Sequence, residues 1–260
     1  MGASPLTLSS TWTRFQFNSP GHPKKPTTLL ETDLDVGLGI RLDQTLVRDS
    51  PPFRSLSEHQ ETRYASLKYI SKAPKKDSDI EPDELAHYAN IPNIRVRFQK
   101  KAWADEGVIL DYMHDFREDT EGLGEVILGM DRHGSQKTPL VREFMSWVGI
   151  FPLYTPPECT DVVSPCDHHI GRHLQVLLAE RYEEAYDANQ MAWDMNGIET
   201  PEKRMLFATW ASEAWTDLCT NNKHLIHNAF VETGFLLARD GSENELIKLQ
   251  NWNADEPYDF

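Results

Sequence analysis

An alternation of strand and helix patterns runs through residues 125–175. The apolar run Val126–Met130 predicts a buried strand that ends at Asp131, and Ile150–Tyr154 predicts a second buried strand. A helical pattern separates the two strands, and another begins at Asp167 after a proline-containing turn. This order is typical of parallel strands joined by helical crossovers, in which ligands bind at the carboxyl ends of the strands. Both acids therefore stand where an α/β sheet places its chemistry.

The segments around the first of these strands carry further local signals. Thr138 can cap the intervening helix, Pro139 suits its first position, and Gly149 suits its end. Upstream, Ile94–Phe98 alternates apolar and polar residues, which predicts a half-buried antiparallel strand. Asp105–Phe116 has apolar residues at helical spacing and predicts a helix before the strand.

A third acid follows an earlier alternating pattern. Leu38, Ile40 and Leu42 alternate with other residues and are followed directly by Asp43. The pattern predicts a strand whose end delivers this acid. Tyr64–Ile70, in contrast, fits either a strand or the beginning of a helix.

The C-terminal third has helical patterns almost throughout. Thr200 and Pro201 predict the start of one helix, and residues 224–239 predict another. Ser242 and Glu245 have the spacing of a capping box before a last apolar run. The tryptophans of this region follow helical stripes and are predicted to be packing anchors rather than a base-stacking platform. They are Trp193, Trp210, Trp215 and Trp252.

The composition limits the classes of function. The formal net charge of −15, from 26 basic and 41 acidic residues, argues against tight binding of DNA by the isolated chain. The three cysteines are too few for a disulfide framework and favour a reducing compartment. No apolar run reaches membrane-spanning length. We therefore expect a soluble intracellular protein that does not bind membranes.

Three carboxylates at the ends of strands or the starts of helices suit a divalent-metal site for phosphodiester chemistry. Mg²⁺ and Mn²⁺ prefer oxygen ligands, and two ions about 4 Å apart can clamp the attacking and leaving oxygens of an in-line displacement. In this hypothesis Asp43 is shared, Asp131 completes one metal site and Asp167 the other. By spacing alone, the same residues also fit ordinary surface aspartates or helix caps.

Three motifs carry a resemblance to a known family. They are Leu-Asp-Gln-Thr at 42–45, Leu-Gly-Met-Asp-Arg-His-Gly-Ser-Gln-Lys-Thr-Pro at 128–139, and the segment 152–167, which begins Pro-Leu-Tyr-Thr-Pro-Pro-Glu-Cys-Thr-Asp and ends Ser-Pro-Cys-Asp. Together they resemble the catalytic core of pogo-type (Tc1/mariner superfamily) DDE transposases. The interval between the second and third acids also matches this family. The resemblance covers residues 38–190 and is strongest over 94–175.

The resemblance implies an α/β fold with an RNase H-like mixed sheet flanked by helices. The domain organisation expected from it is a flexible leader over 1–36, the catalytic core over 37–190 and a helical C-terminal extension over 191–260.

The resemblance also implies a function. Asp43, Asp131 and Asp167 would hold Mg²⁺ or Mn²⁺ for DNA strand cleavage and joining. DNA is the expected partner, bound weakly without a separate DNA-binding module, a homodimer is a candidate assembly, and the nucleus is the expected location.

The chain departs from the family pattern at several positions. Arg132 replaces an asparagine beside the second acid, and Gln136 stands where a histidine is common. Ser164–Asp167 replaces the usual Gln-Pro-Leu-Asp, and two histidines follow it. A basic helix-turn-helix module is not recognisable ahead of the core. The chain therefore resembles a truncated or domesticated derivative.

Two alternatives to an active endonuclease remain. One is a catalytically inactive transposase remnant that acts as a nuclear protein-interaction module through its acidic surface and C-terminal helices. The other is a zinc site, because His169 and His173 are four residues apart on a predicted helix. The candidate zinc ligands are Cys159, Cys166, His168, His169 and His173.

Overall fold

A computed structural model gives the architecture. It describes residues 39–41, 44–47, 67–72, 80–99, 104–122, 124–131, 133–157, 159–195, 197–238 and 240–249. Outside these ranges lie the predicted leader at 1–36 and the residues Asp43, Arg132 and Trp252. Within them the fold is mixed α/β and mostly helical.

The described strands form two small sheets of three strands each. The strands are β1 Gly39–Arg41, β2 Gln44–Val47, β3 Leu67–Lys72, β4 Ile94–Gln99, β5 Val126–Met130 and β6 Ile150–Tyr154. The first sheet has the order β1-β3-β4, with β1 antiparallel to β3 and β3 parallel to β4. The second has the order β2-β5-β6, with β2 antiparallel to β5 and β5 parallel to β6. Each of the two sheets is mixed, because each combines one antiparallel pair with one parallel pair.

The strand predicted before Asp43 corresponds to β1, and a separate strand, β2, begins directly after Asp43. β1 pairs within the first sheet and β2 within the second, so the chain passes from one sheet to the other between Arg41 and Gln44. The described part of the ambiguous pattern at 64–70 belongs to a strand, β3, which begins at Leu67. The antiparallel orientation predicted for Ile94–Phe98 is wrong, because β4 pairs with β3 in parallel. A helix separates these two strands in the chain, and a parallel pair requires such a crossover.

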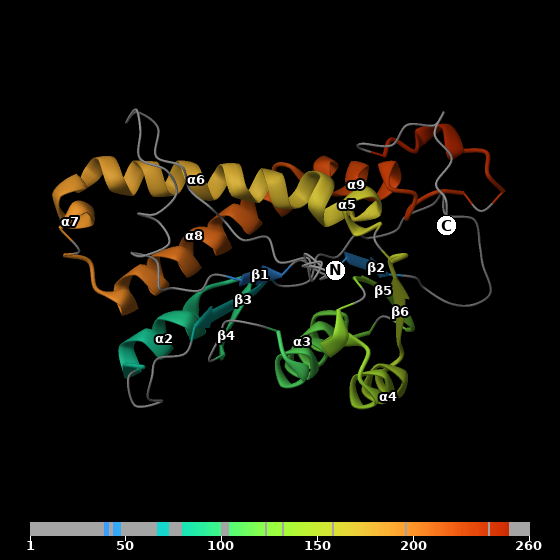
Figure 1. Ribbon diagram of the computed structural model, residues 1–260, viewed down its shortest axis with the longest axis horizontal. Coiled ribbons are helices and arrows are strands. Elements are labelled where there is room, and N and C mark those ends of the chain that lie inside the picture. The colour runs from blue at the N-terminus through green and yellow to red at the C-terminus, as the bar shows by residue number, and fades with distance from the viewer. Residues whose placement is uncertain are drawn as a thin grey trace, which may run out of the picture.

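Helices surround the sheets. They are α2 Pro82–Asn90, α3 Glu106–Asp119, α4 Pro139–Val148, α5 Thr160–Val163, α6 Gly171–Ala188, α7 Gln190–Asp194, α8 Thr200–Thr220 and α9 Lys223–Glu232. Shorter turns are the 3-10 helices η2 Gly134–Gln136 and η4 Asn244–Leu246, and the π-helical turn η3 Cys166–Ile170. Figure 1 shows the long helices α6 and α8 side by side on one side of the sheets, with α3 and α4 on the other. None of the described helices is both long enough and apolar enough to span a bilayer.

Local signals explain the β5–α4–β6 unit. Thr138 caps α4 by accepting a hydrogen bond from the Val141 amide, and Pro139 occupies the first turn as predicted. Gly149 ends the helix in the left-handed conformation, at φ 75°, which glycine adopts without a steric cost. The chain then returns as β6 beside β5 in the parallel orientation that the alternation predicted.

β6 lies at the edge of the sheet that the described strands form, and it is only half buried. The strand has the predicted bounds and Ile150 is buried, but Phe151 and Leu153 are 51% and 48% exposed, so the predicted burial holds only in part. The Thr155 amide donates to the Met130 carbonyl of β5. Backbone amides alternate in direction along a strand, so the amides of Leu153 and Phe151 also face β5. The backbone nitrogen of Pro152 therefore faces the free edge. Proline has no N–H to donate, and the edge of a sheet is where it is tolerated.

Two hydrophobic clusters support the sheets. One lies under β5 and β6 and is built mainly from the buried faces of α3 and α4. The other joins α2 and β4 to the helices from η3 to α9 and contains Trp193, Trp210 and Trp215, which confirms these three as packing anchors. α8 packs on α6 and also on β3 and β4. The division of the chain at residue 190 stays a prediction.

The C-terminal helices end earlier than predicted. α9 stops at Glu232 because Gly234 adopts a left-handed conformation at φ 85°, and the Phe235 amide donates back to the Phe230 carbonyl. The capping box predicted at Ser242 is also wrong, since its hydroxyl donates to Asp240 Oδ1 at 2.7 Å. Only the short turn η4 follows.

Candidate functional site

Asp131 lies at the carboxyl end of β5, where the sequence predicted it. Val126, Leu128 and Met130 of this strand are buried in the cluster formed with α3 and α4, so Asp131 emerges at the rim of that core. The adjacent Met130 carbonyl accepts a hydrogen bond from the Thr155 amide at 2.8 Å, which fixes the ends of β5 and β6 together. The Asp131 side chain is partly buried and its Oδ1 atom is enclosed. The backbone around this carboxylate is therefore held by the sheet.

The turn after Asp131 connects β5 to α4, and hydrogen bonds and packing contacts hold it in place. His133 Nδ1 and Ser135 Oγ are 2.7 Å apart, within hydrogen-bond distance. The Tyr154 hydroxyl, from the end of β6, donates to the Gln136 carbonyl at 3.1 Å. The turn η2 also packs against α3 and α4. This loop is thus tied to the same end of β6 as Asp131.

The side chain of Gln136 is the unusual feature of this turn. It is 0% exposed, and among the described residues neither its Oε1 nor its Nε2 atom has a hydrogen-bond partner. A buried amide without partners destabilises the folded state, because both atoms lose their hydrogen bonds to water on folding.

Gln136→Met is therefore expected to raise the free energy of unfolding by about 1–3 kcal/mol, since methionine keeps the length of the side chain and carries no unsatisfied amide. Urea denaturation measures the change. Gln175→Met, on an exposed position of α6, is the matched control and should change stability little. A loss of stability in Gln136→Met would show that the amide has a partner in solution, such as a buried water molecule.

Asp167 lies on a different element. It occupies the first turn of η3, where its side chain is exposed and its amide donates to the buried Ser164 Oγ at 3.3 Å. η3 packs between α5, α6 and α9. A single π-helical turn of this kind is rare and often occurs at functional sites.

The connection from β6 leads from the neighbourhood of Asp131 to Asp167. Thr155, which is bonded to Met130, has its Oγ1 3.3 Å from Thr160 Oγ1 at the start of α5. α5 then packs on η3. Asp43 lies outside the described residues, but Gln44, which follows it, pairs with Gly129 on β5.

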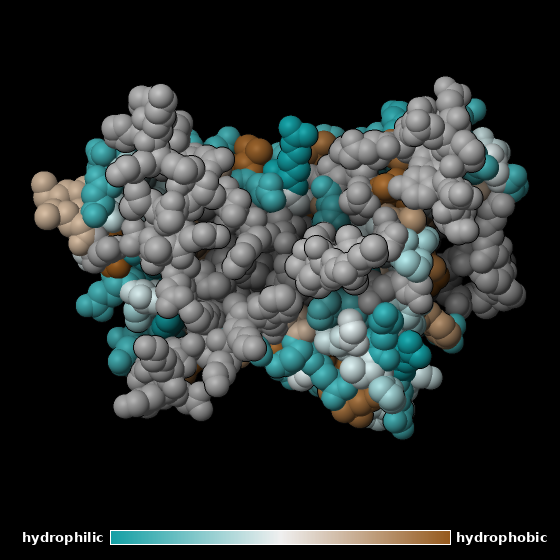
Figure 2. Space-filling model, viewed as in Figure 1, coloured by the Kyte–Doolittle hydropathy of each residue, from teal (hydrophilic) through white to brown (hydrophobic). Residues whose placement is uncertain are grey.

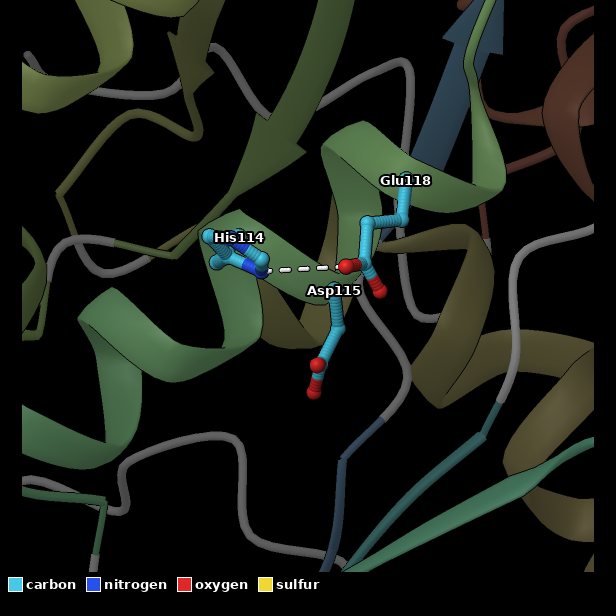
Figure 3. A group of neighbouring side chains, drawn as sticks. All are labelled: His114, Asp115 and Glu118. Carbon is cyan, nitrogen blue, oxygen red and sulfur yellow. Dashed lines mark ion pairs between the residues drawn. The ribbon is translucent and has the colours of Figure 1, made fainter.

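The structure also brings together a group of side chains that the sequence did not single out. His114, Asp115 and Glu118 on α3 have potential ligand atoms within 4.8 Å of one another, and Figure 3 shows the ion pair of 3.5 Å between His114 and Glu118. Two arginines of β4 already pair with these acids. Arg97 bonds both carboxylate oxygens of Asp115 at 3.1 Å, and Arg95 lies 3.3 Å from Glu118.

We interpret this group as an ion network that ties β4 to α3. A metal ion would have to displace guanidinium groups that already neutralise the carboxylates. The signal in the sequence was the alternation of Arg95 and Arg97 on a strand, followed by acids at helical spacing from Asp111 to Asp119.

The cysteines take no part in a comparable group. In the part of the chain that the structure describes, no set of potential metal ligands includes Cys159, Cys166 or His173. Cys159 and Cys166 are buried as free thiols. Burial raises the pKa of Cys219 to about 12, which disfavours the thiolate that binds metal. The side chains of His168 and His169 lie outside the described residues.

A comparison with known families decides the classification. The family model described as DDE superfamily endonuclease matches residues 68–230, which is more than half of the chain. The chain belongs to this family. The DDE endonuclease match begins in β3 and ends in α9, so it includes Asp131 and Asp167 but not Asp43. No curated protein and no solved structure matches this chain.

Proposed function

We propose that this DDE endonuclease domain is transposase-derived and of the pogo type, and that it cleaves and joins DNA at phosphodiester bonds. Asp43, Asp131 and Asp167 are the proposed ligands for Mg²⁺ or Mn²⁺. The observation that carries the proposal is the position of Asp131 at the carboxyl end of β5, inside the region matched by the DDE endonuclease family.

The pairing of β2 with β5 supports a role for Asp43 in the same site. Gln44, the residue after Asp43, lies opposite Gly129, two residues before Asp131. The β6 end and α5 lead to Asp167 as described above. We propose an RNase H-like fold on the same grounds, because a mixed sheet with parallel β5 and β6 is packed against α3 and α4.

The donor set fits a hard divalent cation. All three residues offer carboxylate oxygens, which Mg²⁺ and Mn²⁺ prefer over nitrogen or sulfur ligands. One oxygen of Asp131 is enclosed by the protein, so this carboxylate is held in place rather than free in solvent. When bound, the metal ions would stabilise the attacking and leaving oxygens of the phosphodiester.

The residues around the acids have supporting roles in this proposal. The β5–β6 pairing and the Tyr154 bond to Gln136 orient the Asp131 loop. Ser164 orients the first turn of η3, which carries Asp167. The net charge of −15 disfavours tight binding of the DNA backbone, so a partner or a separate module would hold the substrate. A nuclear location and a homodimer belong to the same proposal.

A Mn²⁺ titration by thermal shift tests the metal site. The wild-type chain is expected to gain stability because three clustered carboxylates repel one another until a cation binds. At a concentration about 100 times Kd the gain is roughly 2.7 kcal/mol, or a rise in Tm of about 5–10 °C. Asp43→Asn should lose most of this shift.

Asp187→Asn on the exposed face of α6 is the matched control and should keep the full shift. An equal shift in wild type and Asp43→Asn would place the metal elsewhere. No shift in either would contradict the proposal and point to an inactive remnant.

A further inference from the structure

The short helix α7 forms a fixed turn between the two longest helices, α6 and α8. Trp193 anchors it from the inside: the indole is 9% exposed, donates to the Ala185 carbonyl at 3.2 Å, and packs edge-on against Tyr182. Lys203 lies 5.8 Å from the centre of the same ring. Asn189 caps α7 by accepting from the Ala192 amide. The turn is therefore held from the core side.

Two methionines point outward from this turn. Met191 and Met195 are 73% and 76% exposed, and the Met195 amide donates to the Met191 carbonyl, so the two residues are one helical turn apart and share a face. Figure 2 shows a pale brown projection at the α7 end of the molecule, with hydrophilic residues beside it. Methionine is flexible and polarisable and packs against apolar partners of varied shape. Exposure of two adjacent methionines suggests a contact surface.

The charged residues around the methionines are all acidic. Residues 183–202 contain six acidic side chains and no basic one, and all six are exposed. They are Glu183, Glu184, Asp187, Asp194, Glu199 and Glu202. Among the described residues only Glu184 of these six takes part in an ion pair, with Arg181. We call these six acids, with Met191 and Met195, the acidic methionine tip.

Among the described residues, the nearest basic residues leave five of the six acids without an ion pair: Arg181 pairs with Glu184 and also with Glu213, which lies outside the tip. Lys203 is buried against Trp193, and Arg204 is buried in a bidentate pair with Glu84. The surface thus combines an apolar centre with unbalanced negative charge.

We propose that the acidic methionine tip is a docking site for a basic amphipathic peptide, in which apolar side chains cover Met191 and Met195 while Lys or Arg residues face the acids. Helices of this kind bind apolar surfaces through residues at helical spacing. Opposite charge around the apolar centre steers the encounter and excludes acidic partners.

The chemistry of the tip selects this partner over others. Its negative charge repels the phosphates of nucleic acids and of anionic membranes. Its acids do not form a metal-binding group, since among the described residues the only such group is His114, Asp115 and Glu118 on α3. The proposal is independent of the catalytic carboxylates.

Fluorescence anisotropy with the full chain tests the proposal. The probe is a labelled synthetic amphipathic helix of leucine and lysine, compared with one peptide in which serine replaces leucine and another in which glutamate replaces lysine. Wild type should bind only the leucine–lysine helix, and more weakly as salt rises. The double variant Met191→Ser, Met195→Ser should weaken binding at least roughly tenfold, because two apolar contacts are lost.

Matched variants separate a site from non-specific attraction. Trp147→Ser removes a more exposed apolar side chain, on α4, and should leave binding unchanged. Met191→Leu with Met195→Leu should restore it. Neutralising Asp187 and Glu199 should weaken binding and reduce its salt dependence, whereas Glu245→Gln on η4 should not. Equal binding of the serine peptide, no binding to wild type, or full binding by the double serine variant would each overturn the proposal.

Discussion

Glu84→Gln is expected to lower the free energy of unfolding by about 3–5 kcal/mol. Glu84 is 1% exposed and holds Arg204 through two hydrogen bonds of 2.7 Å, from Nε and from the terminal nitrogen. It also accepts a bond of 2.6 Å from the Tyr88 hydroxyl. The variant keeps the shape of the side chain but removes its charge, so the Arg204 guanidinium would remain buried without a counter-charge.

The Arg204 guanidinium of this variant cannot become neutral by losing its proton. In the wild type, burial lowers its pKa, but the hydrogen bond and charge of Glu84 outweigh burial and leave the pKa above its usual value. Even without Glu84, the guanidinium stays protonated at neutral pH. The cost therefore appears as lost stability, and urea denaturation measures it.

Two comparisons sharpen the test. Glu81→Gln, at the exposed N-cap of the same helix, should change stability by less than about 0.5 kcal/mol. The double variant Glu84→Leu, Arg204→Met should lose less stability than the sum of its single changes, because an apolar pair leaves no buried charge. A loss below about 1 kcal/mol in Glu84→Gln would show that water reaches the pair in solution.

Asp131→Asn is expected to reduce Mn²⁺-dependent nicking of supercoiled plasmid by roughly 10³-fold. The amide has nearly the same volume as the carboxylate but carries no negative charge, so it weakens the proposed metal site without opening the β5–β6 end. A loss of about 4 kcal/mol of transition-state stabilisation corresponds to this factor. A gel assay of nicked and supercoiled DNA measures it.

The experiment must distinguish a loss of folding stability from a loss of catalysis. The Tm of Asp131→Asn without metal should equal or exceed the wild-type value, because the change removes one negative charge from the proposed cluster of carboxylates. Asp187→Asn should nick DNA at the wild-type rate. If Asp131→Asn keeps its activity, the nuclease site is not at the end of β5.

The sequence predicted those parts of the fold that local interactions determine. Thr138 and Gly149 set the ends of α4 through a side-chain cap and a left-handed residue, which are visible in the sequence without knowledge of the partners. The apolar run of β5 and the placement of Asp131 after it are of the same kind. Gly234 was an equally local signal for the end of α9, and the prediction of a helix to residue 239 did not take it into account.

Pairing between distant segments was not predictable in this way. Alternation shows that Ile94–Phe98 is a strand, but β3 decides its parallel orientation. The network of Arg95 and Arg97 with α3 depends on two elements meeting, as does the enclosure of Gln136 between α3 and α4. The candidate site was recognisable mainly through family motifs, because aspartates are common in this chain and spacing alone does not distinguish a ligand from a cap.

Pro152 has a consequence for the behaviour of the protein at high concentration. An edge strand offers its amides and carbonyls to any extended chain that approaches, and intermolecular sheets grow by that route. On β6 the central outward position has a carbonyl but no amide, so a ladder added from another molecule would be interrupted at its middle. Pro152 thereby protects the strand that helps to position Asp131 from intermolecular sheet formation.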